Sequence, residues 1–113
     1  MSGVNLSPVP AVLTAAAINF AASGDNTVIA AGGATQIIRV YRIFFVSAGT
    51  TNITFKSGAS VLLSGAMPFA ANGSLTFSME GEPWFTCGAG QAFVINNSAA
   101  IQISGTVYST LGL

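Results

Sequence analysis

The stretch that decides the fold is QIIRVYRIFFVS, residues 36–47. It is rich in β-branched and aromatic residues, which favour strands. Successive side chains of a strand point to opposite faces, so an apolar set on each face means that both faces must be covered. We expect a second sheet to cover one face and another subunit to cover the other, because no helical segment is available. One face carries Ile37, Tyr41, Ile43 and Phe45, and the other carries Ile38, Val40, Phe44 and Val46.

On either side of this stretch the apolar pattern has period two, and turn-forming residues separate the segments. Eight short strands at roughly 8–12-residue spacing predict an all-β fold, an eight-stranded antiparallel β-sandwich that is jelly-roll-like. Ala15–Ala22 is too short for a convincing helix and is predicted as part of a strand. The expected strands are Thr14–Ala22, Asn26–Ala31, Gln36–Ser47, Thr51–Lys56, Ser60–Ser64, Ser74–Met79, Ala92–Asn96 and Ala100–Tyr108.

The first 13 residues differ from the rest, because Pro8 and Pro10 alternate with apolar residues there. Proline fixes φ and removes a backbone donor, which favours an extended segment over a helix. We therefore predict an extended N-terminal arm over residues 1–13 and a single β-sandwich domain over residues 14–113. The arm is expected to be ordered only where it lies on a neighbouring protein.

Charged residues are scarce: the 113 residues include three Lys+Arg, three Asp+Glu and no His, for a net charge of zero. This is 5% of the chain, against about 25% in ordinary domains. A folded chain of this size exposes about 5,800 Å². Six charged side chains on that area are too few to prevent association with other protein molecules. The composition predicts a subunit of a permanent assembly. It excludes a nucleic-acid binder, which needs a basic surface, and argues against disorder.

Membrane insertion and secretion are not favoured. The longest charge-free stretches are Met1–Gly24, Ser57–Met79 and Pro83–Leu113, and each is interrupted by Pro, Gly, Asn or Ser. None contains the roughly 20 apolar residues of a spanning helix. Ala11–Ala22 is weakly apolar, but no Lys or Arg precedes it as in a signal peptide. The sequence therefore favours synthesis in the cytoplasm, with no membrane partner.

Candidate catalytic groups are few. Without His, a Ser-His-Asp arrangement within one chain is excluded. Glu80 and Glu82 would share one face of a strand, as a carboxylate pair for glycoside hydrolysis requires, but Gly81 and Pro83 favour a turn. Asp25 alone supplies too few oxygen ligands for Ca²⁺, so we predict that Asp25 helps to form a turn. We expect no enzyme activity, no metal and no cofactor.

The single cysteine, Cys87, excludes an intrachain disulfide. It stands between Phe85 and a Gly-Ala-Gly turn, with no cation nearby in sequence to lower its pKa. We predict a buried and inert thiol. Gly88-Ala89-Gly90 is too short and isolated to form a phosphate-binding loop.

The remaining charged and large aromatic residues are candidates for an interface. Arg39 and Arg42 are three residues apart and fall on opposite faces of their strand, so they form no basic patch. One hypothesis pairs one or both of them with Glu80 or Glu82 across a subunit contact, and the alternative is a snorkelling side chain at a sheet edge. Trp84 is predicted to fill the core, to anchor an interface or to stack on a sugar. Lys56 is predicted to be a solubilising or edge-protecting charge. The candidate interface residues are Arg39, Tyr41, Arg42, Glu80, Glu82 and Trp84.

The last third of the chain carries a resemblance. Pro83-Trp84-Phe85, Gly88-x-Gly90-x-Ala92 and the run from Val94 to Tyr108 resemble the C-terminal part of small tailed-bacteriophage structural proteins. Asn72-Gly73-Ser74-Leu75 is similar to the same pattern. The resemblance implies a β-sandwich virion protein, most like a head decoration or cement protein that sits as a homotrimer on the major capsid protein and is made in the bacterial cytoplasm. It carries over no site residues.

Two other functions stay open at this point. One is a trimeric host-binding module of a fibre or spike, with Trp84 and Tyr108 stacking on glycans. The other is a small glycan-active enzyme that uses Glu80 and Glu82.

Overall fold

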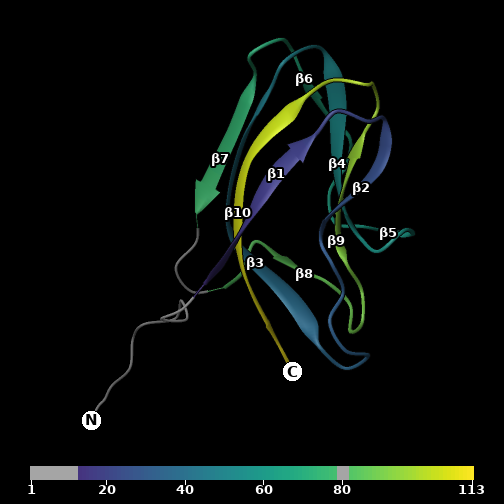
Figure 1. The fold of residues 1–113 in the computed structure, drawn as a ribbon, viewed down its shortest axis with the longest axis vertical. Coiled ribbons are helices and arrows are strands. Elements are labelled where there is room, and N and C mark those ends of the chain that lie inside the picture. The colour runs from purple at the N-terminus through teal and green to yellow at the C-terminus, as the bar shows by residue number, and fades with distance from the viewer. Residues whose placement is uncertain (1–12, 79–81) are drawn as a thin grey trace.

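A computed structural model describes residues 13–78 and 82–113 (Figure 1). Nearly all of the predicted N-terminal arm, and Glu80, lie outside the described residues.

The described residues form ten strands and no helix, arranged as two five-stranded antiparallel sheets packed face to face (Figure 1). The first sheet, here the β3 sheet, has the order β1-β10-β3-β7, with β8 also paired to β3. The second, the β4 sheet, has the order β2-β9-β4-β5, with β6 also paired to β4. The predicted all-β sandwich is confirmed. The strands are β1 (Thr14–Phe20), β2 (Gly24–Ile29), β3 (Ile37–Ser47), β4 (Thr51–Ser57), β5 (Val61–Leu62), β6 (Met67–Phe69), β7 (Ser74–Ser78), β8 (Phe85–Thr86), β9 (Phe93–Asn97) and β10 (Ile103–Gly112).

Each of the eight expected segments contains a strand, and β6 and β8 come in addition. Both are too short to show a period-two pattern in the sequence. β8 pairs with Arg39 and Val40, on the same edge of β3 where β7 pairs with residues 42–46. β5 and β6 likewise follow one another along β4. Each sheet therefore has one edge made of two short strands in place of a continuous one.

The face of β3 that is buried changes part-way along the strand. Ile38 and Val40 are buried, and so are Ile43 and Phe45, although the two pairs have opposite parity. The register with β10 shifts between them, since Val40 lies opposite Ser109 and Arg42 opposite Tyr108. The extra residue on β3, Tyr41, forms a β-bulge, which re-aims the side chains that follow.

The bulge corrects the sequence prediction that one apolar face of this strand is left without cover. Four large apolar side chains from both predicted faces enter the same core. On the outer side, Phe44 and Val46 remain, 44% and 45% exposed. The uncovered apolar surface of β3 is thus much smaller than the alternation predicts.

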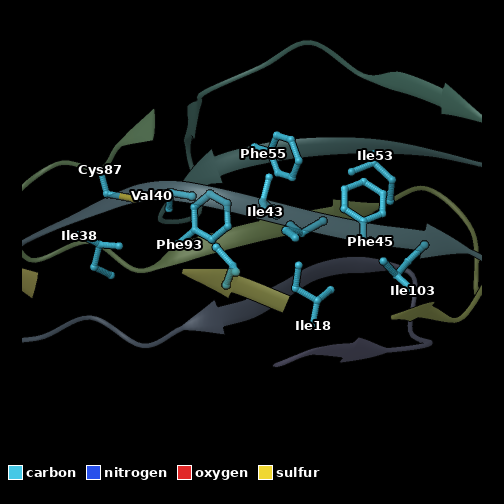
Figure 2. Packing of buried hydrophobic residues seen from close by; sticks show 12 residues of the cluster. Ile18, Ile38, Val40, Ile43, Phe45, Ile53, Phe55, Cys87, Phe93 and Ile103 are labelled. Atoms are coloured by element: carbon cyan, nitrogen blue, oxygen red, sulfur yellow. The ribbon is translucent and has the colours of Figure 1, made fainter. Parts of the chain in front are cut away.

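Aromatic rings join the two sheets at the centre of the core (Figure 2). Phe55 of β4 meets Phe45 of β3 edge-on, with ring centroids 6.1 Å apart. It stacks on Phe93 of its own sheet at 5.8 Å and tilts against Phe85 of β8 at 4.9 Å. Such pairs stabilise beyond the area that they bury. Phe55 therefore contacts two rings of the β3 sheet, Phe45 and Phe85.

A buried polar cluster closes one end of the sandwich. Asn97 is fully buried, and its amide donates to the Ile101 carbonyl at 2.9 Å. Its Oδ1 accepts from the Thr51 hydroxyl at 2.5 Å, and that hydroxyl accepts from the Ala99 amide at 3.2 Å. Because buried polar groups cost stability unless they are hydrogen-bonded, these bonds fix the loop after β9 against the start of β4.

We expect Gly105→Ala to destabilise the fold, because β10 and β3 approach closely at this position. A Cβ on Gly105 would meet the Phe44 carbonyl oxygen and would lie 2.6 Å from the Phe45 Cα. The free energy of unfolding, measured by urea denaturation, should fall by roughly 2–4 kcal/mol. Gly65→Ala is the control, since no heavy atom lies within 4 Å of the position that its new methyl group would occupy, and it should change stability by less than about 0.5 kcal/mol. Equal stability of the two variants would contradict the close approach.

Candidate functional site

The fold brings most of the candidate interface residues to one end of the β3 sheet. Arg39, Tyr41 and Arg42 lie on β3, and β8 pairs beside them. The Trp84 amide donates to the Val40 carbonyl at 2.7 Å, so Trp84 sits directly beside this end of β3. Glu82 precedes it by two residues in the chain. These residues form what we call the β3–β8 end, and Glu80 lies outside the described residues.

The side chains of the β3–β8 end differ in exposure. Trp84 is 43% exposed, so the prediction that it fills the core is wrong. Phe85, its neighbour, instead packs against the core. Arg42 and Glu82 are exposed, whereas Tyr41 is only 6% exposed and has little surface left for a partner. Trp84, Arg42 and Glu82 are therefore the groups here that a partner can reach.

Arg39 has a contact within its own chain. One guanidinium nitrogen donates to the backbone carbonyl of Leu113 at 3.2 Å, which holds the C-terminal residue beside β3. Among the described residues, Arg39 and Arg42 form no ion pair with a carboxylate. Their pairing with a glutamate of another subunit stays a prediction.

The ion pair of the described residues lies on the other sheet. The Lys56 ammonium is 3.0 Å from both carboxylate oxygens of Asp25, and the Asn96 amide donates to one of them at 2.8 Å. These side chains come from three adjacent strands, β4, β2 and β9, on the outer side of the β4 sheet. The hydrogen bond from Asn96, followed by that from Lys56, lowers the pKa of Asp25 below its ordinary value.

The positions of this pair differ from the sequence interpretation. Asp25 lies in β2 rather than in the turn, and Lys56 lies on β4, which pairs with other strands along both edges. The Lys56 side chain is 13% exposed, which is less than an edge-protecting charge would show. The two residues are 31 positions apart, so no local pattern reveals the contact.

Cys87 is buried, as predicted, with 2% of its surface exposed. Burial raises the pKa of its thiol, and a hydrogen bond with the Ser57 side chain opposes that shift in part. The Ser57 hydroxyl also accepts from the Gly88 amide at 2.9 Å. A thiol of raised pKa is a poor nucleophile at neutral pH, which fits a packing role.

The outer side of the β3 sheet carries an uncharged surface that sequence reasoning did not separate from the core. Phe44 lies opposite Thr106 of β10 and Thr76 of β7. Val46 lies between Ser104 and Ser74 in the same way. Two apolar side chains thus stand among short hydroxyl side chains. The alternating pattern could have identified them only if the bulge at Tyr41 had been foreseen.

Other exposed apolar residues lie at the periphery. Val61 and Leu62 of the short β5 are 55% and 65% exposed, and Leu111 and Leu113 are 51% and 85% exposed. In Figure 1, β5 projects from the side of the β4 sheet.

Within residues 13–78 and 82–113, no three His, Cys, Asp or Glu side chains gather as a metal site requires, and no pocket is found. No helix in this part of the chain is long and apolar enough to cross a membrane. A scan against protein-family models gives no match to the chain. A search of curated proteins likewise gives no significant match.

The Asp25–Lys56 pair makes stability depend on pH. Because folding lowers the pKa of Asp25, the pair stabilises the protein at a pH above the unfolded pKa of about 3.9, and this contribution disappears as pH falls through the folded pKa. Asp25→Asn should therefore lower the urea midpoint at pH 7, and the difference from wild type should vanish at pH 2. The effect is small, because the carboxylate is one-third exposed.

Lys56→Gln is the complementary variant, since it removes the other charge of the same pair. Its urea midpoint should also lie below that of wild type at pH 7 and approach it at pH 2. A difference between Asp25→Asn and wild type that persists at pH 2 would contradict the electrostatic origin.

Proposed function

We propose that the protein is a capsid decoration, or cement, protein that binds the outside of a bacteriophage head as a homotrimer and stabilises the shell. The observation that carries the proposal is the surface chemistry. Asp25 and Lys56 neutralise each other, and Arg39 donates to the Leu113 carbonyl. Of the described charged residues, this leaves Arg42 and Glu82 without such a partner. A surface so poor in unpaired charge suits a protein buried in a permanent assembly.

The strand order supports a viral structural role. If β5 and β6 count as one edge position, and β7 and β8 as another, the sandwich has eight positions. Their orders are then β1-β10-β3-β7/β8 and β2-β9-β4-β5/β6. We propose that this arrangement is a jelly roll, the two-sheet fold with eight strands that occurs in viral capsid domains and lectins. Fold alone does not fix function, so the strand order is weaker support for the proposal than the scarcity of unpaired surface charge.

The proposed contact between subunits is the β3–β8 end. Trp84 is a large, partly exposed side chain of the type that anchors interfaces. Arg42 and Glu82 beside it carry opposite charges and are both exposed. In a three-fold ring, each contact is heterologous, so Arg42 of one chain can face Glu82 of the next. A trimer is preferred over a dimer because of the resemblance to decoration proteins, which match the three-fold positions of an icosahedral shell.

Charge reversal tests the trimer. At micromolar concentration, wild type should sediment in analytical ultracentrifugation as a trimer or as a larger species built of trimers. Arg42→Glu or Glu82→Arg alone should weaken association about tenfold or more, because each places like charges together, and the double variant should restore it. Asp25→Asn is the control that alters charge on the other sheet and should leave the trimer intact. A monomeric wild type, or a double variant no better than the single ones, would contradict this contact.

Phage particles test the cementing role. Particles of the phage that encodes the chain should contain many copies of it by quantitative mass spectrometry. Particles assembled without it should form but release DNA at a lower temperature, and adding the purified protein should restore the release temperature. Unchanged particle stability would contradict the proposal.

A host-binding module is the second candidate, and the exposure of Trp84 favours it, because an aromatic face at the surface can stack on a sugar ring. This function predicts few copies per particle and quenching of Trp84 fluorescence by host glycans. Trp84→Phe keeps an aromatic ring, whereas Trp84→Ala does not. Comparison of the two variants separates the loss of stacking on a sugar from a general loss of surface area.

A further inference from the structure

The edges of the two sheets differ in how they are protected against pairing with another chain. An exposed strand edge presents unpaired N–H and C=O groups, and proteins block such edges with charges, prolines, bulges or very short strands. β2 has a register shift between Thr27 and Ile29 and carries Asp25. β5 and β6 have two and three residues, and β6 contains Pro68. β7 and β8 are separated by six residues of chain.

β1 has none of these features. It runs for seven residues, Thr14–Phe20, with a continuous register against β10 and with no proline, glycine or charged residue. It stands at the end of its sheet, and within the described part of the chain β10 is its one ladder partner (Figure 1). Alternate backbone groups of such a strand point away from the sheet. Among the described strands, β1 is therefore the longest unprotected edge.

We infer that β1 is a self-pairing site, at which β1 of a second copy adds antiparallel to extend the β3 sheet. A ladder over the whole of β1 needs a partner strand of the same length without a bulge or break. Among the described edge strands, β1 alone meets that condition, because the others have six residues with a bulge, or five or fewer. Pairing of identical strands gives a two-fold, isologous contact.

The side chains of β1 fit this contact when the pairing is centred on Ala17. Ala17 then faces its own counterpart, Ala15 faces Asn19, and Ala16 faces Ile18. The exposed outer side carries Ala15, Ala17 and Asn19, which are small or polar and bring no like charges together. On the inner side, Ala16 and Phe20 are half-buried and pack at the margin of the core. Pairing would cover the remaining exposed surface of Ala16 and Phe20 and make the hydrophobic cores of the two copies continuous.

This site does not depend on the proposed trimer. β1 and β8 lie on opposite edges of the β3 sheet, so one chain can use both contacts at once. If both exist, the β3–β8 end closes a ring and β1 links that ring to a neighbouring one. If the trimer is absent, β1 pairing still yields a dimer.

A cysteine cross-link tests the register directly. In a Cys87→Ala background, Ala17→Cys places two thiols opposite each other across the two-fold axis, and mild oxidation should give a disulfide-linked dimer on a non-reducing gel. Thr76→Cys in the same background is the control, because Thr76 is also exposed and lies on β7 at the other edge of the sheet. It should stay uncross-linked.

A charge at the two-fold axis tests the association. Ala17→Lys puts two ammonium groups face to face, which opposes pairing, so the dissociation constant of the β1 contact should rise about tenfold or more, and the particles in solution should become smaller. Thr76→Lys should leave both unchanged, and circular dichroism should show that all variants fold. Absence of the residue 17 cross-link, an equal cross-link at residue 76, or unchanged association of Ala17→Lys would each overturn the inference.

Discussion

The β-bulge at Tyr41 is the constraint on which the rest of the structure depends. β3 pairs along both edges, with β10 on one side and with β7 and β8 on the other. Without the extra residue, the strand would keep one parity, and either Ile38 and Val40 or Ile43 and Phe45 would face solvent. With it, all four side chains enter one core. The bulge therefore converts a strand that is apolar on both faces into one that a single sandwich can cover over most of its length.

The close approach of β10 to β3 follows from the same ladder. Gly105 leaves no room for a side chain against the β3 backbone, so the two strands lie close just beyond the bulge. Phe45 is held there, and it meets Phe55 of the opposite sheet. Backbone geometry within one sheet thus fixes the aromatic contact that joins both sheets.

The same arrangement decides which surfaces are left for partners. Since the bulge buries most of β3, Phe44 and Val46 are the exposed large apolar side chains of β3. The remaining candidates for contact are the β3–β8 end, where Trp84 is partly exposed, and the open edge of β1. The proposed assembly therefore depends on a few side chains and one strand edge, rather than on the broad apolar face that the sequence suggests.

Much of this candidate site could not have been found from the sequence. Trp84 lies beside β3 because β8, a strand of two residues, pairs with Arg39 and Val40, and no periodic pattern marks so short a strand. The Asp25–Lys56 pair and the contact of Arg39 with Leu113 join residues 31 and 74 positions apart. Contacts of that separation depend on strand order, which local propensities do not encode.

What the sequence by itself determined is the class of structure. Period-two alternation and turn residues define the strands, because a half-buried sheet needs that pattern, and the burial of Cys87 follows from its apolar surroundings. The scarcity of charge is also a property of the sequence alone. The tertiary structure decided which face of each strand is buried, because parity changes wherever a bulge adds one residue. It also decided which charges are paired and which strand edge is open, because these depend on how distant segments meet.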